Sequence, residues 1–554
     1  MNVGNKWWLA AAAGLGLAVG GGFWALGASW QHAMTARINV PKPAAPQTVA
    51  LPNGAKAHVF DRNSVYSFLA AAKRAEANGD ALQRCLAYPD PPGSHWSPAA
   101  VAAYCRYRTA PLMSVEQVRG LLEQGQYAEL DRRMAGMLDD KLHKPDVAGV
   151  MDHAFESWFN RSDLDLRPLL EHWKQASPHS AFAYTASGVS YVAMAWHARG
   201  EKYIQDTPRS NIEAMDRFLA LADADLQRAA KLDPRMTPAY VAMIDAGQLS
   251  LGTDYVRGAA EAGLRVDPAN FAIYNELMRA LQPRWGGSIE QMKQNGQTAL
   301  MHASDNPLLM LLPEKAVAEE VDLAGDNCKV PGRFEQFSLV FDQVAVASQL
   351  STAAESAEEC NHLELSAVYY SEELRFYPED SNARAHRVYN LNEFDESAWA
   401  VAEATRLMHE EPGNADYVAS RGNAYEMLND YPHAEQDYLA TLALSPNHSQ
   451  AVVALANLYL NLTHDWDKAW ALDERIVQAA PAEPYGWWLR GEIQIRQPRK
   501  GLKETADYFA AHFDTTPDLH RTLLRMRAAQ ALQEGAAAKA SAKAGASQHH
   551  ASLQ

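Results

Sequence analysis

The sequence predicts an all-α protein, an α-solenoid of paired helices that follows one N-terminal transmembrane helix. Three observations favour this fold class. The 24 residues from Trp7 to Trp30 carry no charge. Hydrophobic residues make up 47% and charged residues 21% of the 554-residue chain, which are ordinary values for a folded protein. Five prolines recur at intervals of 34, 34, 35 and 36 residues, namely Pro378, Pro412, Pro446, Pro481 and Pro517.

The uncharged segment at residues 7–30 is long enough to cross a membrane. As a helix it would span about 36 Å, and the hydrocarbon core of a bilayer is about 30 Å thick. Tryptophans at both ends fit the aromatic anchors of a membrane interface. A cleaved signal peptide, with a small-residue site at Ala25 and Gly27, and a buried helix are the alternatives.

Charges beside this segment favour one orientation. Lys6 and the free amino terminus place the N-terminus in the cytoplasm, although Arg37 and Lys42 on the other side weaken this assignment. The bulk of the chain would then lie outside the cytoplasm. Gly16 and Gly20 form a small-xxx-small pair through which two copies could form a homodimer.

The next segment and the C-terminal end are predicted to lie outside the folded body. Residues 31–60 are rich in proline and alanine, which is typical of a semi-extended spacer. Residues 531–554 contain mostly Ala, Gly, Ser, Lys and His without an apolar period, so we expect a disordered tail.

The proline spacing predicts helix pairs, because proline cannot continue the preceding helix and period lengths near 34 residues are typical of helical solenoids. Residues 415–446 illustrate the pattern. Gly422 and Ala434 are small enough to let two paired helices approach, and Tyr425 and Tyr438 can fill the space between pairs.

These spacings resemble the tetratricopeptide repeat, whose pattern is W-x2-L-G-x2-Y, A-x3-F and P. The match is good for residues 415–481 and fair for 381–412 and 484–517. Arg421 and Arg490 stand where the pattern has leucine, so we expect looser packing at those two positions.

The resemblance implies that certain first-helix positions face a concave groove that binds protein or peptide partners. Ala419 and Val453 stand where the family's clamp for C-terminal carboxylates would carry lysine, which argues against that ligand. Alternatively, Asn423 and Asn457 only satisfy neighbouring backbone groups. The candidate groove residues are Tyr389, Asn392, Asn423, Glu426, Asn457, Trp488 and Glu492.

A second region, residues 161–320, also has helical apolar spacing. It contains the strings AWHARG at residues 195–200 and PRWGGS at 283–288, with Asp-Pro pairs at 233–234 and 267–268. Over residues 161–313 these features resemble a bacterial family defined only as a domain of unknown function. The resemblance implies membership and says nearly nothing about activity.

Arg199, Arg284 and Trp285 are the candidate pocket residues of this region. In the functional interpretation, an arginine pairs with an acidic group or stacks on an aromatic ring. In the structural interpretation, which we favour, a buried Arg and Trp fix an inter-helix loop, while Gly286 and Gly287 form the turn and Ser288 caps the next helix.

The four cysteines are too few for a disulfide-built scaffold. In an oxidising compartment the simplest pairings are Cys85 with Cys105 and Cys328 with Cys360, which are 20 and 32 residues apart. Four free thiols are the alternative.

No recognisable catalytic motif is present, so we predict a protein that is not an enzyme, with no catalytic residues and no cofactor. His153 and Glu156, beside Asp152, have the spacing of half a carboxylate-bridged metal site, but the matching half is missing. We therefore predict no metal site.

The sequence thus predicts a non-catalytic scaffold that binds protein or peptide partners at the bacterial cell envelope. It would be a single-pass inner-membrane protein, with most of the chain in the periplasm. A formal net charge of −17 disfavours nucleic acid. The alternatives are an envelope enzyme with a site near Arg199 and Arg284, and an assembly protein that dimerises through its membrane helix.

The predicted segments are 1–30 (anchor), 31–60 (spacer), 61–160 (N-terminal helical region), 161–320 (domain of unknown function), 321–377 (helical connector), 378–530 (tetratricopeptide repeats) and 531–554 (tail).

Overall fold

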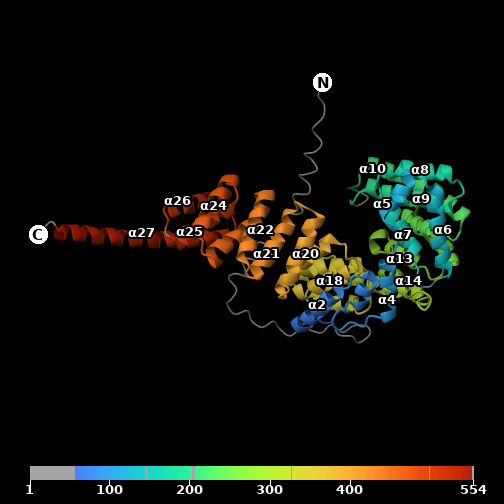
Figure 1. The fold of residues 1–554 in the computed structure, drawn as a ribbon, viewed down its shortest axis with the longest axis horizontal. Helices are drawn as coiled ribbons and strands as arrows, with labels where there is room; N and C mark the ends of the chain where they lie inside the picture. The colour runs from blue at the N-terminus through green and yellow to red at the C-terminus, as the bar shows by residue number, and fades with distance from the viewer. Residues whose placement is uncertain (1–56, 144–147, 203–205, 326, 498, 552–554) are drawn as a thin grey trace, which may run out of the picture. The chain divides into compact units, whose positions relative to one another are not determined.

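The computed structural model describes residues 57–551, except 144–147, 203–205, 326 and 498. Within these ranges all regular secondary structure is helical, as predicted (Figure 1). The chain divides into two compact units. Of the described residues, those up to Asn390 form one, called here the N-terminal unit, and those from Leu391 onward form the other, called the C-terminal unit.

The predicted membrane segment at residues 7–30 and most of the predicted spacer lie outside the described residues. In the part of the chain that the structure describes, no helix has both the length and the apolarity required to span a bilayer.

The N-terminal unit is built from successive helices, with a π-helical turn η3 (Gly247–Leu251) and the 3-10 turns η4 (Pro283–Trp285), η5 (Pro307–Leu311) and η6 (Asn327–Lys329). The α-helices are α2 (Arg62–Glu76), α3 (Ala81–Ala87), α4 (Pro98–Arg108), α5 (Val115–Glu123), α6 (Tyr127–His143), α7 (Val150–Phe159), α8 (Leu166–Ala176), α9 (Ala181–Arg199), α10 (Arg209–Leu232), α11 (Thr237–Ala246), α12 (Thr253–Val266), α13 (Phe271–Ala280), α14 (Ile289–Leu300), α15 (Pro313–Val321), α16 (Arg333–Val340), α17 (Ala347–Glu359) and α18 (Leu363–Phe376). Helix α19 (Ser381–Glu393) crosses the boundary between the units.

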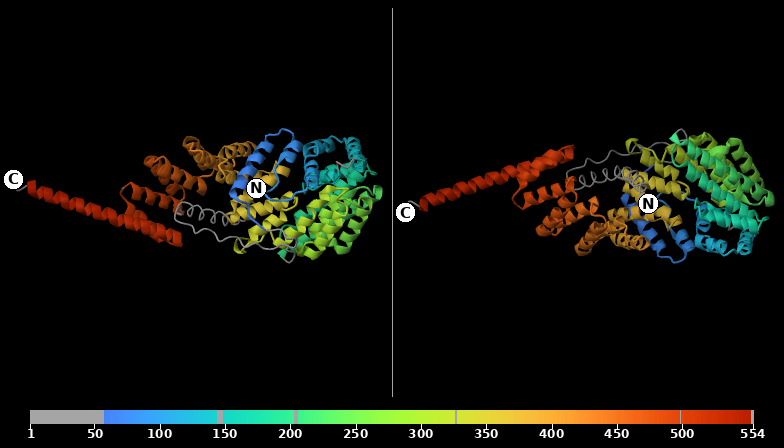
Figure 2. Two further views of the ribbon diagram at one scale, coloured as in Figure 1. Left: turned by 90° about the horizontal axis from the view of Figure 1, so that it is seen from below. Right: turned by 90° about the horizontal axis from the view of Figure 1, so that it is seen from above.

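Paired helices form the middle of this unit. Helix α9 packs along α10, α11 along α12, and α13 against α14, and Figure 2 shows the green helices of this region running alongside one another. The Asp-Pro pairs at 233–234 and 267–268 lie in the loops before α11 and α13. At Gly188, an added Cβ would lie 2.5 Å from Leu226, so only glycine permits the close approach of α9 to α10.

Helix α18 is the buried centre of the remaining helices. Every residue from Leu365 to Phe376 is buried, and α2, α3 and α4 pack on it from far away in the sequence. Arg375 donates to the Cys85 carbonyl at 2.9 Å and to the Asp90 carboxylate at 2.9 Å. The first helices of the unit therefore bind to a helix about 290 residues later in the sequence. In a simple solenoid, each helix pair would contact only its neighbours in the sequence.

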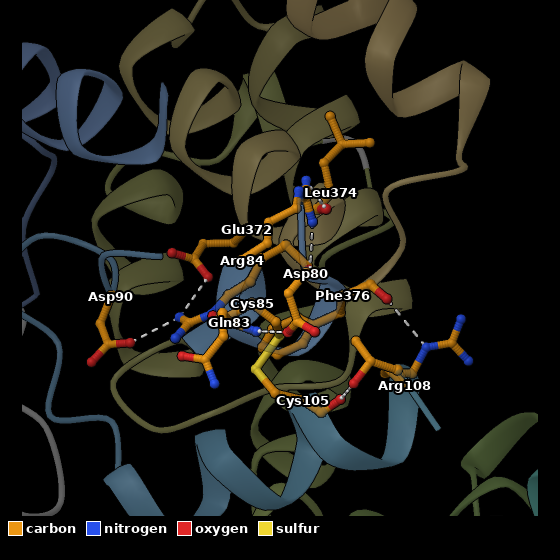
Figure 3. Close-up of a disulfide and its surroundings, with 12 residues drawn as sticks. Asp80, Gln83, Arg84, Cys85, Asp90, Cys105, Arg108, Glu372, Leu374 and Phe376 are labelled. Carbon is orange, nitrogen blue, oxygen red and sulfur yellow. Dashed lines mark hydrogen bonds and ion pairs between the residues drawn. A yellow bond between two sulfur atoms is a disulfide. The ribbon is translucent and has the colours of Figure 1, made fainter. Parts of the chain in front are cut away.

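Both sequence-local cysteine pairings are present in the structure. A disulfide joins Cys85 on α3 to Cys105 on α4, beside Asp90 and Glu372 (Figure 3). A second disulfide joins Cys328 to Cys360. All four cysteines lie in the N-terminal unit.

The C-terminal unit contains the helix pairs expected from the proline spacing. Pro412, Pro446 and Pro481 each lie in the loop before a first helix, whereas Pro517 is the first residue of α27. The helices are α20 (Ser397–Glu410), α21 (Ala415–Met427), α22 (Tyr431–Leu444), α23 (Ser449–Asn457), α24 (Trp466–Ala479), α25 (Pro484–Arg496), α26 (Leu502–His512) and α27 (Pro517–Ala551).

A π-helical turn, η7 (Leu458–Leu462), absorbs the one extra residue between Pro446 and Pro481. The Thr463 amide donates to the Leu458 carbonyl five residues earlier at 2.8 Å.

The packing at Arg421 and Arg490 differs from the looser contact that we expected. Arg421 donates to both carboxylate oxygens of Asp437 at 2.8 Å, and Arg490 donates to Asp473 at 2.9 Å. Both aspartates are buried. An ion pair between helices thus replaces the apolar contact of leucine.

The segment at residues 531–554, expected to be a disordered tail, is helical up to Ala551 as the end of α27. Its alanine, glutamine, glutamate and lysine residues have high helix propensity, so a helix can continue here without an apolar face.

Candidate binding groove in the N-terminal unit

A groove of about 490 Å³ opens in the N-terminal unit along the first helices of successive pairs. Helices α7, α9, α11 and α13 each present one face to it, and α4 contributes Tyr107 at one end. The lining residues are Tyr107, Asp152, Phe155, Glu156, Asn160, Ser162, Val189, Val192, Ala193, Trp196, Pro238, Val241, Ala242, Asp245, Phe271, Ala272, Asn275, Glu276 and Arg279.

Asp152 fastens three of these helices together at one end of the groove. Its carboxylate accepts from the Thr237 hydroxyl of α11 at 2.6 Å and from the Asn270 amide at 3.0 Å. The Asn270 side chain also caps α13 by accepting from the Ile273 backbone at 2.8 Å. Lys141 stands 3.7 Å from the same carboxylate, so Asp152 is fully satisfied within the fold.

An arginine flanked by two carboxylates occupies another part of the lining. Arg279 donates to Glu276 at 2.7 Å and forms a second ion pair with Asp245. Its guanidinium also lies 5.3 Å from the centre of the Trp196 ring, and the Trp196 indole donates to Asp245 at 2.7 Å. These contacts join the ends of α9, α11 and α13.

One arginine cannot fully compensate two buried carboxylates. Burial raises the pKa of Glu276 to about 7, and the negative charge of Asp245 adds to the effect. Burial also raises the pKa of Asp245, against the opposing effect of Arg279. Beyond the lining, burial lowers the pKa of Lys315 to about 8, although Glu276 is near; Lys315 donates to Asn275 at 2.7 Å.

Glu156 on α7 differs from the other three lining carboxylates. Its side chain is open to solvent, and within the described part of the chain it makes no hydrogen bond or ion pair. The groove walls nevertheless remove much of the surrounding water, and this desolvation raises the pKa of Glu156. The positive charges of Arg108 and Arg279 and the negative charges of Asp152 and Asp245 act on it in opposite directions.

The residues considered as half of a metal site separate in the structure. Asp152 and Glu156 line the groove, whereas His153 does not. The His153 ring stacks at 4.8 Å on Tyr107, and burial together with Arg108 lowers its pKa to about 4, so it is neutral at pH 7. Among the described residues, no group of three His, Cys, Asp or Glu side chains could hold a metal ion.

The predicted pocket residues lie beside the groove rather than in it. Arg199 stacks near Trp196 and Trp285, at 5.9 and 5.4 Å from the two ring centres. Arg284 is exposed and donates to the Gln282 amide oxygen at 2.8 Å, not to a carboxylate. The two arginines therefore do not converge with acids on one pocket. Arg279, which sequence reasoning missed, does.

The glycines and the serine of this loop agree with the structural interpretation, but the expected burial was wrong, because Arg284 is exposed and Arg199 and Trp285 are only partly buried. Gly286 has φ +88°, which favours glycine, and a Cβ at Gly287 would meet the Leu281 carbonyl oxygen. The Ser288 hydroxyl accepts from the Gln291 backbone at 3.2 Å and caps α14.

Most of the candidate groove residues in and beside the C-terminal unit contact neighbouring repeats. Asn392 donates to Asn423 at 2.9 Å, and Asn457 donates to Glu426 at 3.3 Å. Glu492 accepts from Arg525 at 2.7 Å. These three contacts join first helices of successive pairs, or α25 to α27.

The two aromatic candidates are partly buried. Tyr389 lies on α19, and Trp488 packs against the hydrophobic cores on both sides of α25. Asn423 and Asn457 therefore hydrogen-bond to side chains of neighbouring helices, whereas the alternative interpretation expected bonds to backbone groups.

A register signal could have found the groove. Asp245 and Arg279 stand eleven residues after Pro234 and Pro268, just as Asn423 and Asn457 stand eleven residues after Pro412 and Pro446. Applying the repeat register to the earlier prolines would therefore have nominated two of the groove's charged residues.

Residues 114–252 match the model of a family described as "Domain of unknown function (DUF4034)". The matched range, about a quarter of the chain, begins before the predicted boundary at residue 161 and ends before the PRWGGS string. It includes α7, α9 and α11 of the groove, but not α13.

No curated protein matches the chain. Among solved structures, the chain is similar to a "Crystal Structure of P58(IPK) TPR Domain", with 11% identity over 57% of this chain and 94% of that chain, at a TM-score of 0.22. A score this low carries no argument, so the description of helix pairs rests on the helices themselves.

Proposed function

We propose that the protein is a membrane-anchored helical-repeat scaffold that binds protein or peptide partners at the bacterial cell envelope and is not a catalyst. The observation that carries this proposal is the groove of about 490 Å³, lined by one face each of α7, α9, α11 and α13. Stacked helix pairs create extended concave surfaces of this kind, which are typical binding surfaces of solenoid proteins.

The lining favours a peptide segment as the ligand. Val189, Val192 and Val241 offer apolar surface, while Asn160, Ser162 and Asn275 offer hydrogen-bonding groups. Mixed linings with a few fixed polar groups orient a ligand and supply specificity. The lining residues extend from α7 across α9 and α11 to α13, which suits an extended chain segment.

The envelope location rests on the sequence and on the cysteines. Residues 7–30 would anchor the chain in the inner membrane, residues 31–60 would hold the folded body away from the bilayer, and the body would lie in the periplasm. The cysteine pairs at 85–105 and 328–360 support this placement, because disulfides persist in oxidising compartments.

An envelope enzyme is the second candidate, and the raised pKa of Glu276 favours it, because a carboxyl that titrates near neutrality suits acid–base catalysis. Glu276 is, however, held by Arg279. The exposed Arg284 lies outside the groove, so the structure gives little support to an active site near Arg199 and Arg284.

Dimerisation through Gly16 and Gly20 concerns residues outside those described and stays a separate proposal.

Affinity capture tests the proposed function. The full-length protein carries a C-terminal tag and is captured from cross-linked membranes of its native host. Ala272→Trp fills the groove at the half-buried start of α13, and Glu261→Gln alters an exposed glutamate on α12. We expect the wild type and Glu261→Gln to retain the same partner and Ala272→Trp to lose it. An unchanged partner set in all three proteins, with equal thermal stability, would contradict the proposal.

A further inference from the structure

The groove has a strongly unequal charge distribution. Four carboxylates line it, from Asp152, Glu156, Asp245 and Glu276, and only one basic side chain, Arg279, does so. We infer that the groove binds a segment of a partner protein that places a lysine or arginine side chain against Glu156. The inference rests on the proposed function and specifies its partner.

Three of the four carboxylates already have partners within the fold. Asp152 is held by Thr237 and Asn270, and Asp245 and Glu276 share Arg279. These groups cannot accept a strong new cation without giving up an existing contact. They therefore fix the shape of the groove and its negative potential, but they do not form the docking point.

Glu156 is the lining carboxylate left for a ligand. It is open to solvent and, within the described ranges, lacks a hydrogen-bond or ion-pair partner. The cations near Glu156 have other partners. Arg108 stacks 3.4 Å from the centre of the Tyr377 ring and pairs with Glu379. Arg279 pairs with the other two carboxylates, and Lys315 donates to Asn275. A carboxylate in such partly desolvated surroundings gains most from a charged hydrogen-bond donor.

Aromatic and aliphatic side chains line the same groove as this carboxylate and suit the stem of a long basic side chain. Phe155 precedes Glu156 on α7, and Tyr107 and Phe271 contact each other edge to face at 5.7 Å in the same lining. Lysine and arginine bury their methylene stems along such surfaces, and their charged ends are attracted to aromatic faces.

A protein segment fits better than the other cationic ligands. A divalent metal would need several ligating side chains, and the structure describes no such group of three. A free polyamine would match the charge but would leave the apolar wall of Val189, Val192 and Val241 uncovered. The flanking residues of a peptide can cover that wall.

Selection from a phage-displayed library of short random peptides tests the inference on the full-length protein in detergent. We expect the wild type to enrich peptides that contain lysine or arginine and that Ala272→Trp does not retain. A selected lysine peptide should bind Glu156→Gln at least about tenfold more weakly, and Glu261→Gln should bind it unchanged. Replacing the peptide's lysine with norleucine should cause the same loss.

Each other result has a distinct meaning. Groove-dependent peptides without enriched basic residues, or equal binding by Glu156→Gln, would overturn the inference while leaving the proposed function intact. Spermidine binding that depends on Glu156, without peptide binding, would assign the site to a free polyamine and overturn the peptide assignment. A failure to enrich any peptide that Ala272→Trp excludes would count against the proposed function itself.

Discussion

The two units carry polar side chains at the same repeat position but use them differently. Eleven residues after an inter-repeat proline, the N-terminal unit has Asp245 and Arg279, and the C-terminal unit has Asn423 and Asn457. Asp245 and Arg279 pair with each other and line an open groove. Asn423 and Asn457 also hydrogen-bond to the preceding first helix, but neither lines this groove.

This difference shows that repeat register identifies the inward-facing position without identifying its role. A polar residue there can hold adjacent repeats together or remain available to shape a ligand site. The local partners decide between these roles. In the C-terminal unit Asn392 and Glu426 already satisfy the asparagines, whereas in the N-terminal unit Glu156 stays without a partner among the described residues.

The largest expected effect is a loss of stability in the N-terminal unit alone, because both disulfides lie in that unit. Removing the α3–α4 disulfide with Cys85→Ser and Cys105→Ser should lower the free energy of unfolding of the N-terminal unit by about 3 kcal/mol, because the unfolded chain loses a constraint. Hydrogen exchange should show faster opening in α3, α4 and α18. Dithiothreitol also reduces the Cys328–Cys360 disulfide, so it should destabilise the N-terminal unit of the wild type at least as much. Amides of the cysteine-free C-terminal unit should not respond to either change.

The next effect concerns the buried ion pair of the C-terminal unit. Arg421→Ala leaves the Asp437 carboxylate buried and unpaired, so α21 and α22 should lose about 2–3 kcal/mol of local stability by hydrogen exchange. Substituting leucine at both positions should recover most of this loss, since it restores an apolar contact. A double variant as unstable as Arg421→Ala would show that the charges do not control this packing.

Two glycine-to-alanine substitutions compare a tightly packed helix contact in the C-terminal unit with an open helix surface in the N-terminal unit. At Gly422 an added Cβ would lie 2.9 Å from the Tyr438 ring, so Gly422→Ala should destabilise the C-terminal unit by about 1–2 kcal/mol. At Gly258, on α12, nothing lies within 4 Å of the added Cβ. Gly258→Ala should therefore stabilise the N-terminal unit by up to about 1 kcal/mol in chemical denaturation. The same sign for both variants would contradict the packing described here.

The smallest expected effect is the pH dependence of the groove. The pKa of Glu276 rises from its ordinary value of 4.5 to about 7 in the folded protein. Its contribution to stability is therefore fully present below pH 4.5 and is lost as the pH rises through about 7. Glu276→Gln removes the titrating group and should flatten this part of the curve, measured by chemical denaturation of the full-length protein between these pH values. An identical pH profile in the variant would show that Arg279 keeps Glu276 ionised throughout.

Local sequence patterns predicted the helices well and the site poorly. Prolines and small residues such as Gly422 act through neighbouring turns and the adjacent helix, so their consequences are visible in the sequence. The groove depends on side chains from α7 to α13, which are about 120 residues apart, and their pairing cannot be seen in any one motif. Arg284 stood in a conspicuous string yet proved to be exposed, whereas Arg279 had no motif beyond its register.

Site-specific photocrosslinking compares the two units most directly. A photoreactive residue replaces Ala272 in the groove of the N-terminal unit in one protein and Asn457 on α23 in another, and both full-length proteins are irradiated in native membranes. We expect position 272 to trap a partner and position 457 to label only neighbouring helices of the same chain. A partner trapped from position 457 and not from position 272 would contradict the central claim that the N-terminal groove is the binding site.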